Sequence, residues 1–171
     1  MTGMLVSRLR RWWRDAFLFL LALVVLGLDQ ASKALIVARL AEGQTWDPLP
    51  GTGQFLLFTH ITNTGAVFGL FRDQTILFTL IAVAVSVAIV AYYRYLPNDG
   101  FWLKASLGLQ LGGALGNLLD RLHYGYVVDF INVGIGDLRW YVFNVADSSL
   151  TVGVVILALC LLLRSKDYER R

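Results

Sequence analysis

Four aspartates stand at the edges of long apolar segments, where an ionisable side chain is costly. Asp29 comes late in the first segment, Asp120 ends a later one, Asp147 opens the last, and Asp129 lies in the connection between these two. Ionisable residues at such positions are functional candidates by default. Two carboxyls held close together can share one proton and act on water as acid and base. Carboxylates spread through the membrane depth would instead relay protons.

Each aspartate taken singly also has an ordinary structural explanation. Asp147 directly precedes an apolar helical run and suits the N-cap position, which favours Asp. Asp29 and Lys33 are spaced i, i+4, the order that stabilises a helical ion pair. The aspartates as a group favour a site, because three different segments bring acids to one level.

The elements that carry these aspartates are long and apolar. Hydrophobic residues make up 57% of the 171 residues and charged residues only 16%, against about 25% charged in a soluble domain. Crossing a bilayer takes about 20 mostly apolar helical residues. Four segments are predicted to span, at about 16–40, 74–95, 101–120 and 147–164. The pattern predicts an all-α membrane protein, a four-helix bundle forming a single domain over residues 1–171.

The basic residues predict the direction of these spans, because Lys and Arg gather on the cytoplasmic side. Ten of the fifteen lie in the two tails and in the connection between spans two and three, namely Arg8, Arg10, Arg11, Arg14, Arg94, Lys104, Arg164, Lys166, Arg170 and Arg171. Both termini are therefore predicted to be cytoplasmic. The four aspartates then lie near the outer leaflet boundary.

Two connections face outward in this topology. The first, about 41–73, carries turn formers followed by a β-rich run at 54–62, which predicts a small β-rich cap between spans one and two. The second runs from about Arg121 to Ala146. Within span three, Gly108, Gly112 and Gly116 form a face that lets another helix approach closely.

Five short blocks, in this order and spacing, resemble the lipoprotein signal peptidases (signal peptidase II) of bacteria. The blocks are Asp29-Gln-Ala-Ser-Lys33, Asn63-Thr-Gly-Ala-Val-Phe68, Gly113-Ala-Leu-Gly-Asn-Leu-Leu-Asp-Arg121, Val128-Asp-Phe130 and Phe143-Asn-Val-Ala-Asp147. Each block alone is a weak signal. Together with four spans they are specific, and they reach from the first span to the last.

The resemblance implies a membrane aspartyl endopeptidase of the bacterial cytoplasmic membrane. Such an enzyme cuts the signal peptide of a prolipoprotein just before a diacylglyceryl-modified cysteine, needs no metal or organic cofactor, and meets its substrate and membrane lipid without nucleic acid or an obligate protein partner. Asp129 and Asp147 are implied as the catalytic pair. The implied substrate-binding residues are Asn63, Gly65, Asn117, Arg121 and Asn144, supported by Asp29, Lys33 and Asp120.

Several other signals are assigned ordinary roles. Gly134-Ile-Gly-Asp137 resembles a G-x-G-D protease motif but lies in a loop, so we expect a turn there. His60 and His123 lack the paired spacing of a zinc site. Cys160 lies deep in an apolar run and is expected to pack. The competing functional hypotheses are a small transporter or proton-relay protein and a non-catalytic assembly subunit.

Overall fold

A computed structural model describes residues 2–51, 55–65, 74–96 and 100–169, with side chains from 16 to 163 within those ranges. Residues 66–68 of the Asn63–Phe68 block lie outside the described part, as do Arg72 and the side chains of both basic tails. The described helices are α1 (Thr2–Arg39), α2 (Thr75–Tyr92), the short 3-10 turn η2 (Tyr93–Tyr95), α3 (Phe101–Tyr124) and α4 (Val145–Glu169).

Three of these helices are long and apolar enough to cross a membrane. They are the segments Ala16–Arg39, Thr75–Tyr95 and Val145–Leu163, which match the first, second and fourth predicted spans. Helix α3 differs because it buries polar side chains, among them Lys104, Ser106, Asn117 and Asp120. These residues lower the hydropathy of α3. A fourth crossing therefore stays a prediction.

Helix α3 lies at the centre of the bundle and packs against α1, α2 and α4. A Cβ added to Gly108 or Gly112 would lie 2.8 Å and 2.7 Å from backbone oxygens of α1, and one on Gly113 would lie 2.5 Å from the oxygen of Ala146 in α4. Only glycine leaves room for backbones this close. The predicted close-packing face is confirmed, and Gly113 extends it to a second neighbour.

The end of α3 lies four residues beyond the predicted boundary at residue 120. Gly125 adopts a left-handed conformation with φ 81° and donates its N–H to the carbonyl of Arg121. This is a glycine C-cap, which terminates a helix by satisfying a final carbonyl. Arg121 is therefore part of the helix. The sequence-based prediction that the outer connection begins at Arg121 was wrong.

The cap is a four-stranded antiparallel sheet in the order β1-β2-β3-β4, built from the described residues of both outer connections. Strands β1 (Thr45–Trp46) and β2 (Leu56–Asn63) come from the first, and β3 (Val127–Ile135) and β4 (Leu138–Arg139) from the second. The predicted β-rich cap between spans one and two is confirmed by β1 and β2, but the prediction was incomplete, because half of the strands come from the second connection. Strand β2 needs a backbone partner on both edges, and β3 supplies one of them.

The register of β2 on β3 brings two predicted site residues together. Asn63 pairs with Val127 and Ile61 with Asp129, after an irregularity between Phe58 and Ile61. The β3–β4 turn contains Gly136 at φ 56°, and Asp137 beside it is exposed. A turn is confirmed at Gly136 and Asp137, whereas Gly134 and Ile135 belong to strand β3.

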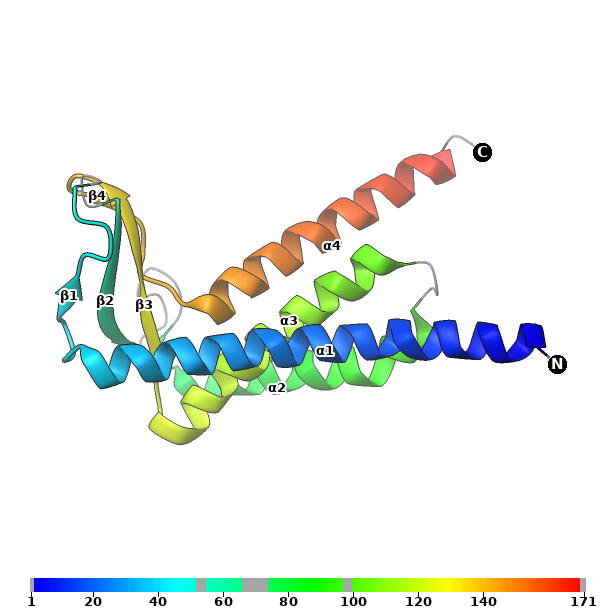
Figure 1. The fold of residues 1–171 in the computed structure, drawn as a ribbon, viewed down its shortest axis with the longest axis horizontal. Helices are drawn as coiled ribbons and strands as arrows, with labels where there is room; N and C mark the ends of the chain where they lie inside the picture. The colour runs from blue at the N-terminus through cyan, green and yellow to red at the C-terminus, as the bar shows by residue number, and fades with distance from the viewer. Residues whose placement is uncertain (1, 52–54, 66–73, 97–99, 170–171) are drawn as a thin grey trace.

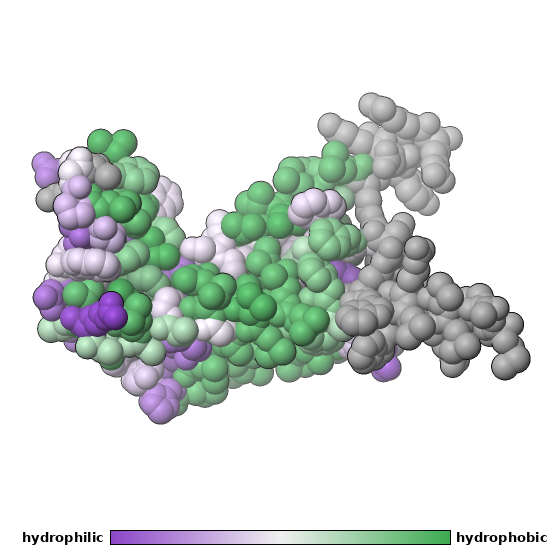
Figure 2. Space-filling model, in the orientation of Figure 1, coloured by the Kyte–Doolittle hydropathy of each residue, from purple (hydrophilic) through white to green (hydrophobic). Residues whose placement is uncertain are grey.

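The sheet is attached to the bundle at the C-terminal end of α1. Ile36, Leu40 and Phe130 form a buried apolar cluster there, with Phe58 and Val145 against it. Figure 1 shows the sheet at one end of the bundle and both chain termini at the other, with α4 diverging from α1. The surface of the bundle in Figure 2 is largely hydrophobic, and polar residues gather around the sheet. This division suits helices in lipid and a sheet at the interface.

Candidate active site

The first turn of α4 presents Asp147 to the interior. Asn144 is the N-cap, because its Oδ1 accepts the backbone N–H of Asp147 at 2.8 Å. Asp147 is the third residue of the helix, and its Oδ2 accepts the backbone N–H of Asn144 at 3.2 Å. This is the reciprocal capping box. The alternative that Asp147 is the N-cap was wrong, since Asn144 holds that position.

Asp129 lies on β3 beside the start of α4. Its Oδ2 accepts Nδ2 of Asn63 at 2.8 Å, and its Oδ1 accepts Nδ2 of Asn144 at 2.7 Å. Asn63 Oδ1 in turn accepts the N–H of Gly65 at 2.9 Å, which orients the Asn63 amide toward Asp129. Asn144 thus binds both Asp129 and Asp147, and it is fully buried.

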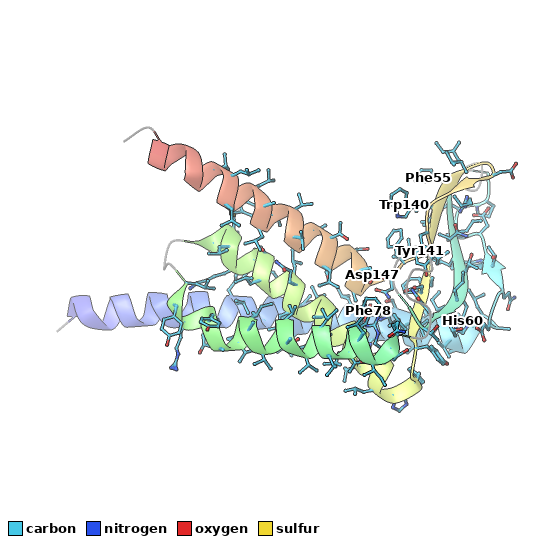
Figure 3. The ribbon with its side chains drawn as sticks, turned by 180° about the vertical axis from the view of Figure 1, so that it is seen from behind. Phe55, His60, Phe78, Trp140, Tyr141 and Asp147 are labelled. Carbon is cyan, nitrogen blue, oxygen red and sulfur yellow. The ribbon has the colours of Figure 1, made fainter. Side chains whose placement is uncertain are left out.

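Both aspartates line one cavity of about 590 Å³ between α2, α3, α4 and the sheet. Asn63, Gly65, Asn117 and Arg121 line it with them, whereas most of the remaining wall is apolar or aromatic. Figure 3 shows Asp147 at the start of α4, facing the side of the sheet that carries Trp140 and Tyr141, with Phe78 on α2 nearby. Figure 2 shows the same region as a hollow between sheet and bundle.

Asp129 titrates near neutrality. Burial in the protein raises its pKa most, the negative charge of Asp147 raises it further, and the hydrogen bonds from Asn63 and Asn144 oppose this, so that the pKa reaches about 7. Among the described residues, neither Asp129 nor Asp147 forms an ion pair. A buried carboxyl with such a pKa in a cavity is typical of general acid–base sites.

The three predicted supporting residues lie behind the cavity as a buried ion-paired group. Lys33 Nζ lies 2.8 Å from Oδ2 of Asp29 and 2.8 Å from Oδ2 of Asp120, so the i, i+4 pair is confirmed. Lys33 Nζ also donates to Oδ1 of Asn117 at 3.0 Å, which occupies all three of its hydrogens. None of the three lines the cavity.

Asn117 joins this group to the cavity. Since its Oδ1 accepts Lys33, its Nδ2 must face the other way, where it donates to Oδ1 of Asp147 at 2.8 Å. Asp29 also contacts the first turn of α4, because its Oδ1 accepts the backbone N–H of Ala146 at 2.9 Å. A carboxylate at a helix N-terminus is favourable. The Lys33 group therefore holds the first turn of α4, including Asp147, in place.

Two contributors were missed at the level of sequence. Gln30 donates to Oδ1 of Asp120 at 2.8 Å and to the carbonyl of Gly116 at 3.2 Å, and its place beside Asp29 in the first block was an available signal. Phe78 lines the cavity under Arg121. Nothing in the apolar run of α2 distinguishes Phe78. No set of three or more His, Cys, Asp or Glu residues able to hold a metal occurs within the described ranges.

The fold and cavity define a multi-pass membrane protein with an acidic site at one end of its bundle. Two solved bacterial membrane enzymes share this architecture. One has a TM-score of 0.79 at 30% identity, covering 89% of this chain and 91% of the other. The second has a TM-score of 0.73 at 31% identity, covering 86% and 93%.

Sequence comparison identifies the family. The family model for Signal peptidase (SPase) II matches residues 21–163. The lipoprotein signal peptidase of Moorella thermoacetica is 46% identical over 151 residues, 88% of this chain and 96% of the relative. That of Enterococcus faecalis is 40% identical over 150 residues, 86% and 89% of the two chains. The chain belongs to the signal peptidase II family.

Proposed function

We propose that this protein is an aspartic endopeptidase that removes the signal peptide from diacylglyceryl-modified prolipoproteins, cutting just before the lipidated cysteine. The observation that carries the proposal is the arrangement of Asp129 and Asp147. The two carboxyls come from different elements, line one cavity, and share Asn144 as a hydrogen-bonding partner. The names of the relatives supply the substrate class.

The proposed chemistry is hydrolysis of the peptide bond by water, activated by two carboxyls that share one proton. With a pKa of about 7, Asp129 is partly protonated at neutral pH. The ionised member of the pair takes a proton from water, while the protonated member donates a hydrogen bond to the scissile carbonyl oxygen. A tetrahedral diol forms, and a carboxyl then protonates the leaving nitrogen. The dyad titrates as a unit.

The surroundings of the pair suit an extended, apolar substrate. Arg121 and the cavity asparagines can bind backbone carbonyls, which are costly to leave unpaired in an apolar setting. The apolar wall from α2 and α4, which includes Ile81, Val85 and Leu150, suits the residues of a signal peptide. We infer that both acyl chains stay in the bilayer while the cysteine reaches the dyad.

We also propose the topology that this reaction requires. Both termini would be cytoplasmic, α3 would be the remaining crossing, and the cavity would lie near the outer leaflet. Support comes from the ten basic residues in the tails and the inner connection and from the position of both termini opposite the sheet (Figure 1). The proton-relay alternative is less well supported, because the buried acids Asp29, Asp120 and Asp129 gather at one end instead of spanning the bundle.

The test is cleavage in detergent micelles of a diacylglyceryl-modified peptide beside its unmodified twin. We expect only the lipidated peptide to be cut, between the residue before the cysteine and the cysteine itself. Asp129→Asn and Asp147→Asn should each lower kcat by about 10³-fold or more, with an unchanged gel-filtration profile and Tm close to the parent value. Normal turnover in either variant would remove the dyad from the mechanism.

A further inference from the structure

Arg121 is held in the cavity by an aromatic ring. Its guanidinium carbon lies 5.5 Å from the centroid of the Phe78 ring, a cation–π distance. Phe78 is in the first turn of α2, at the end nearest the sheet (Figure 3). Both Phe78 and Arg121 line the cavity. The contact thus joins α2 to α3 at the site itself.

The guanidinium has little else to hold it within the described part of the chain. One hydrogen bond to protein is formed there, a long one of 3.4 Å to the carbonyl of Asn117 in its own helix. Asp147, Asp129 and Asp120 all act on it electrostatically. A guanidinium readily forms bidentate pairs with carboxylates. Another contact is therefore needed to keep the Arg121 guanidinium from pairing with these aspartates.

A ring face is suited to this task. Arg carries five N–H donors in one plane, and a guanidinium lying over an aromatic ring is stabilised without using these donors. The contact is stronger where water is excluded, and Arg121 lies in a largely apolar cavity. The donors of Arg121 therefore stay available for a substrate instead of turning to the carboxylates.

We propose that Phe78 is a positioning residue, whose ring holds the Arg121 guanidinium ready to bind the backbone carbonyls of the incoming peptide. This inference rests on the proposed function. It assigns a specific role to one of the many apolar residues of α2. Phe78 acts through Arg121 and takes no part in the proton transfers at Asp129 and Asp147.

The first measurement separates binding from chemistry. The full-length Phe78→Leu variant should raise KM for the diacylglyceryl-modified peptide about tenfold and leave kcat within about twofold, because the lost contact serves binding in the ground and transition states alike. Phe78→Trp and Phe78→Tyr, which keep an aromatic face, should retain KM near the parent value. A loss of folded enzyme would instead lower kcat without changing KM.

A matched control addresses packing. Phe19→Leu makes the same change at a half-buried phenylalanine whose ring contacts Tyr93, 4.9 Å away between centroids. Tyr93 directly follows the last residue of α2, about 22 Å from Phe78 at about 1.5 Å per helical residue. We expect Phe19→Leu to leave KM unchanged.

A double-mutant cycle tests whether Phe78 acts through Arg121. The dissociation constant of the lipidated peptide is measured in the Asp129→Asn background, where turnover does not interfere. Phe78→Leu should weaken binding about tenfold when Arg121 is present and have no further effect in Arg121→Gln. An equal penalty in both backgrounds makes Phe78 an ordinary wall residue and overturns the inference, as does parent-like binding by Phe78→Leu. Cleavage by the Asp129→Asn protein would instead refute the proposed function.

Discussion

Two polar groups, one buried and the other lining the cavity, lie side by side at the sheet end of the bundle, and each contains a pair of aspartates. In the first, Asp29 and Asp120 are both paired with Lys33. In the second, Asp129 and Asp147 are held by amides of Asn63, Asn117 and Asn144. The difference is the kind of donor. An ammonium compensates charge, whereas a neutral amide orients a carboxyl without neutralising it.

This contrast separates a stabilising role from a chemical one. A carboxylate locked to a buried lysine is poorly suited to exchange a proton, but it can tie α1, α3 and the start of α4 together. A carboxyl held by amides beside a second acid keeps a pKa within reach of neutrality, as Asp129 does. We therefore expect substitutions in the Lys33 group to reduce stability, and substitutions around Asp129 and Asp147 to reduce activity.

The largest expected effect on stability is that of Lys33→Met. Removing the lysine leaves Asp29 and Asp120 buried without their cation, which should destabilise the fold by about 3–5 kcal/mol. Thermal unfolding in detergent measures this change, with Asp129→Asn as the control expected to keep a Tm near the parent value. If the two variants unfold at the same temperature, the division of roles is wrong.

Asn117→Ala should affect both properties, because Asn117 bonds Lys33 on one side and Asp147 on the other. We expect a loss of about 1–3 kcal/mol in stability and about 10–100-fold in kcat, the scale of losses when a supporting partner is removed. Asn63→Ala is the matched control, since Asn63 bonds Asp129 but not the lysine group. Asn63→Ala should lower kcat and leave Tm near the parent value. A drop in Tm as large as that of Asn117→Ala would contradict this expectation.

Gly116→Ala tests the close approach of α3 to Asp29 of the Lys33 group. An added Cβ would lie 2.5 Å from Oδ2 of Asp29, so either the carboxylate leaves its position beside Lys33 or the helices move apart, at a cost of about 1–3 kcal/mol. Gly27→Ala is the control, because nothing lies within 4 Å of a Cβ there, and alanine favours a helix by up to about 1 kcal/mol. Equal Tm values for the two variants would show that the close approach is unimportant.

The last effect is the pH dependence of the parent enzyme, which is small close to neutrality and grows with pH. A pair that holds one proton needs Asp129 or its partner protonated, and this form is lost as pH rises through the Asp129 pKa of about 7. Values of kcat/KM for the lipidated peptide should therefore fall about tenfold per unit above that pH. Rates measured about two units either side of neutrality, at constant ionic strength, check this. An activity that keeps rising well above neutrality would contradict a shared proton.

The fold was predictable where the pattern is local. Apolar runs identified the helices at 16–39, 75–95 and 145–163, because a spanning helix must carry its apolar residues in one continuous stretch. The sheet was only half predicted. The β-rich character of 54–62 was visible, but its partner β3 comes from a connection more than 60 residues later, as the pair Asn63 and Val127 illustrates.

The residues of the candidate site were predictable from short blocks, and the predicted topology placed the four aspartates at one end of the spans. What the sequence determined by itself was a set of acids and amides at one level of an apolar bundle. Only the tertiary structure decided which acid meets a lysine, that Asn144 and not Asp147 caps α4, and that Phe78 faces Arg121. Those contacts depend on helix packing and strand register, which join residues distant in the chain, and a linear pattern carries no such distances.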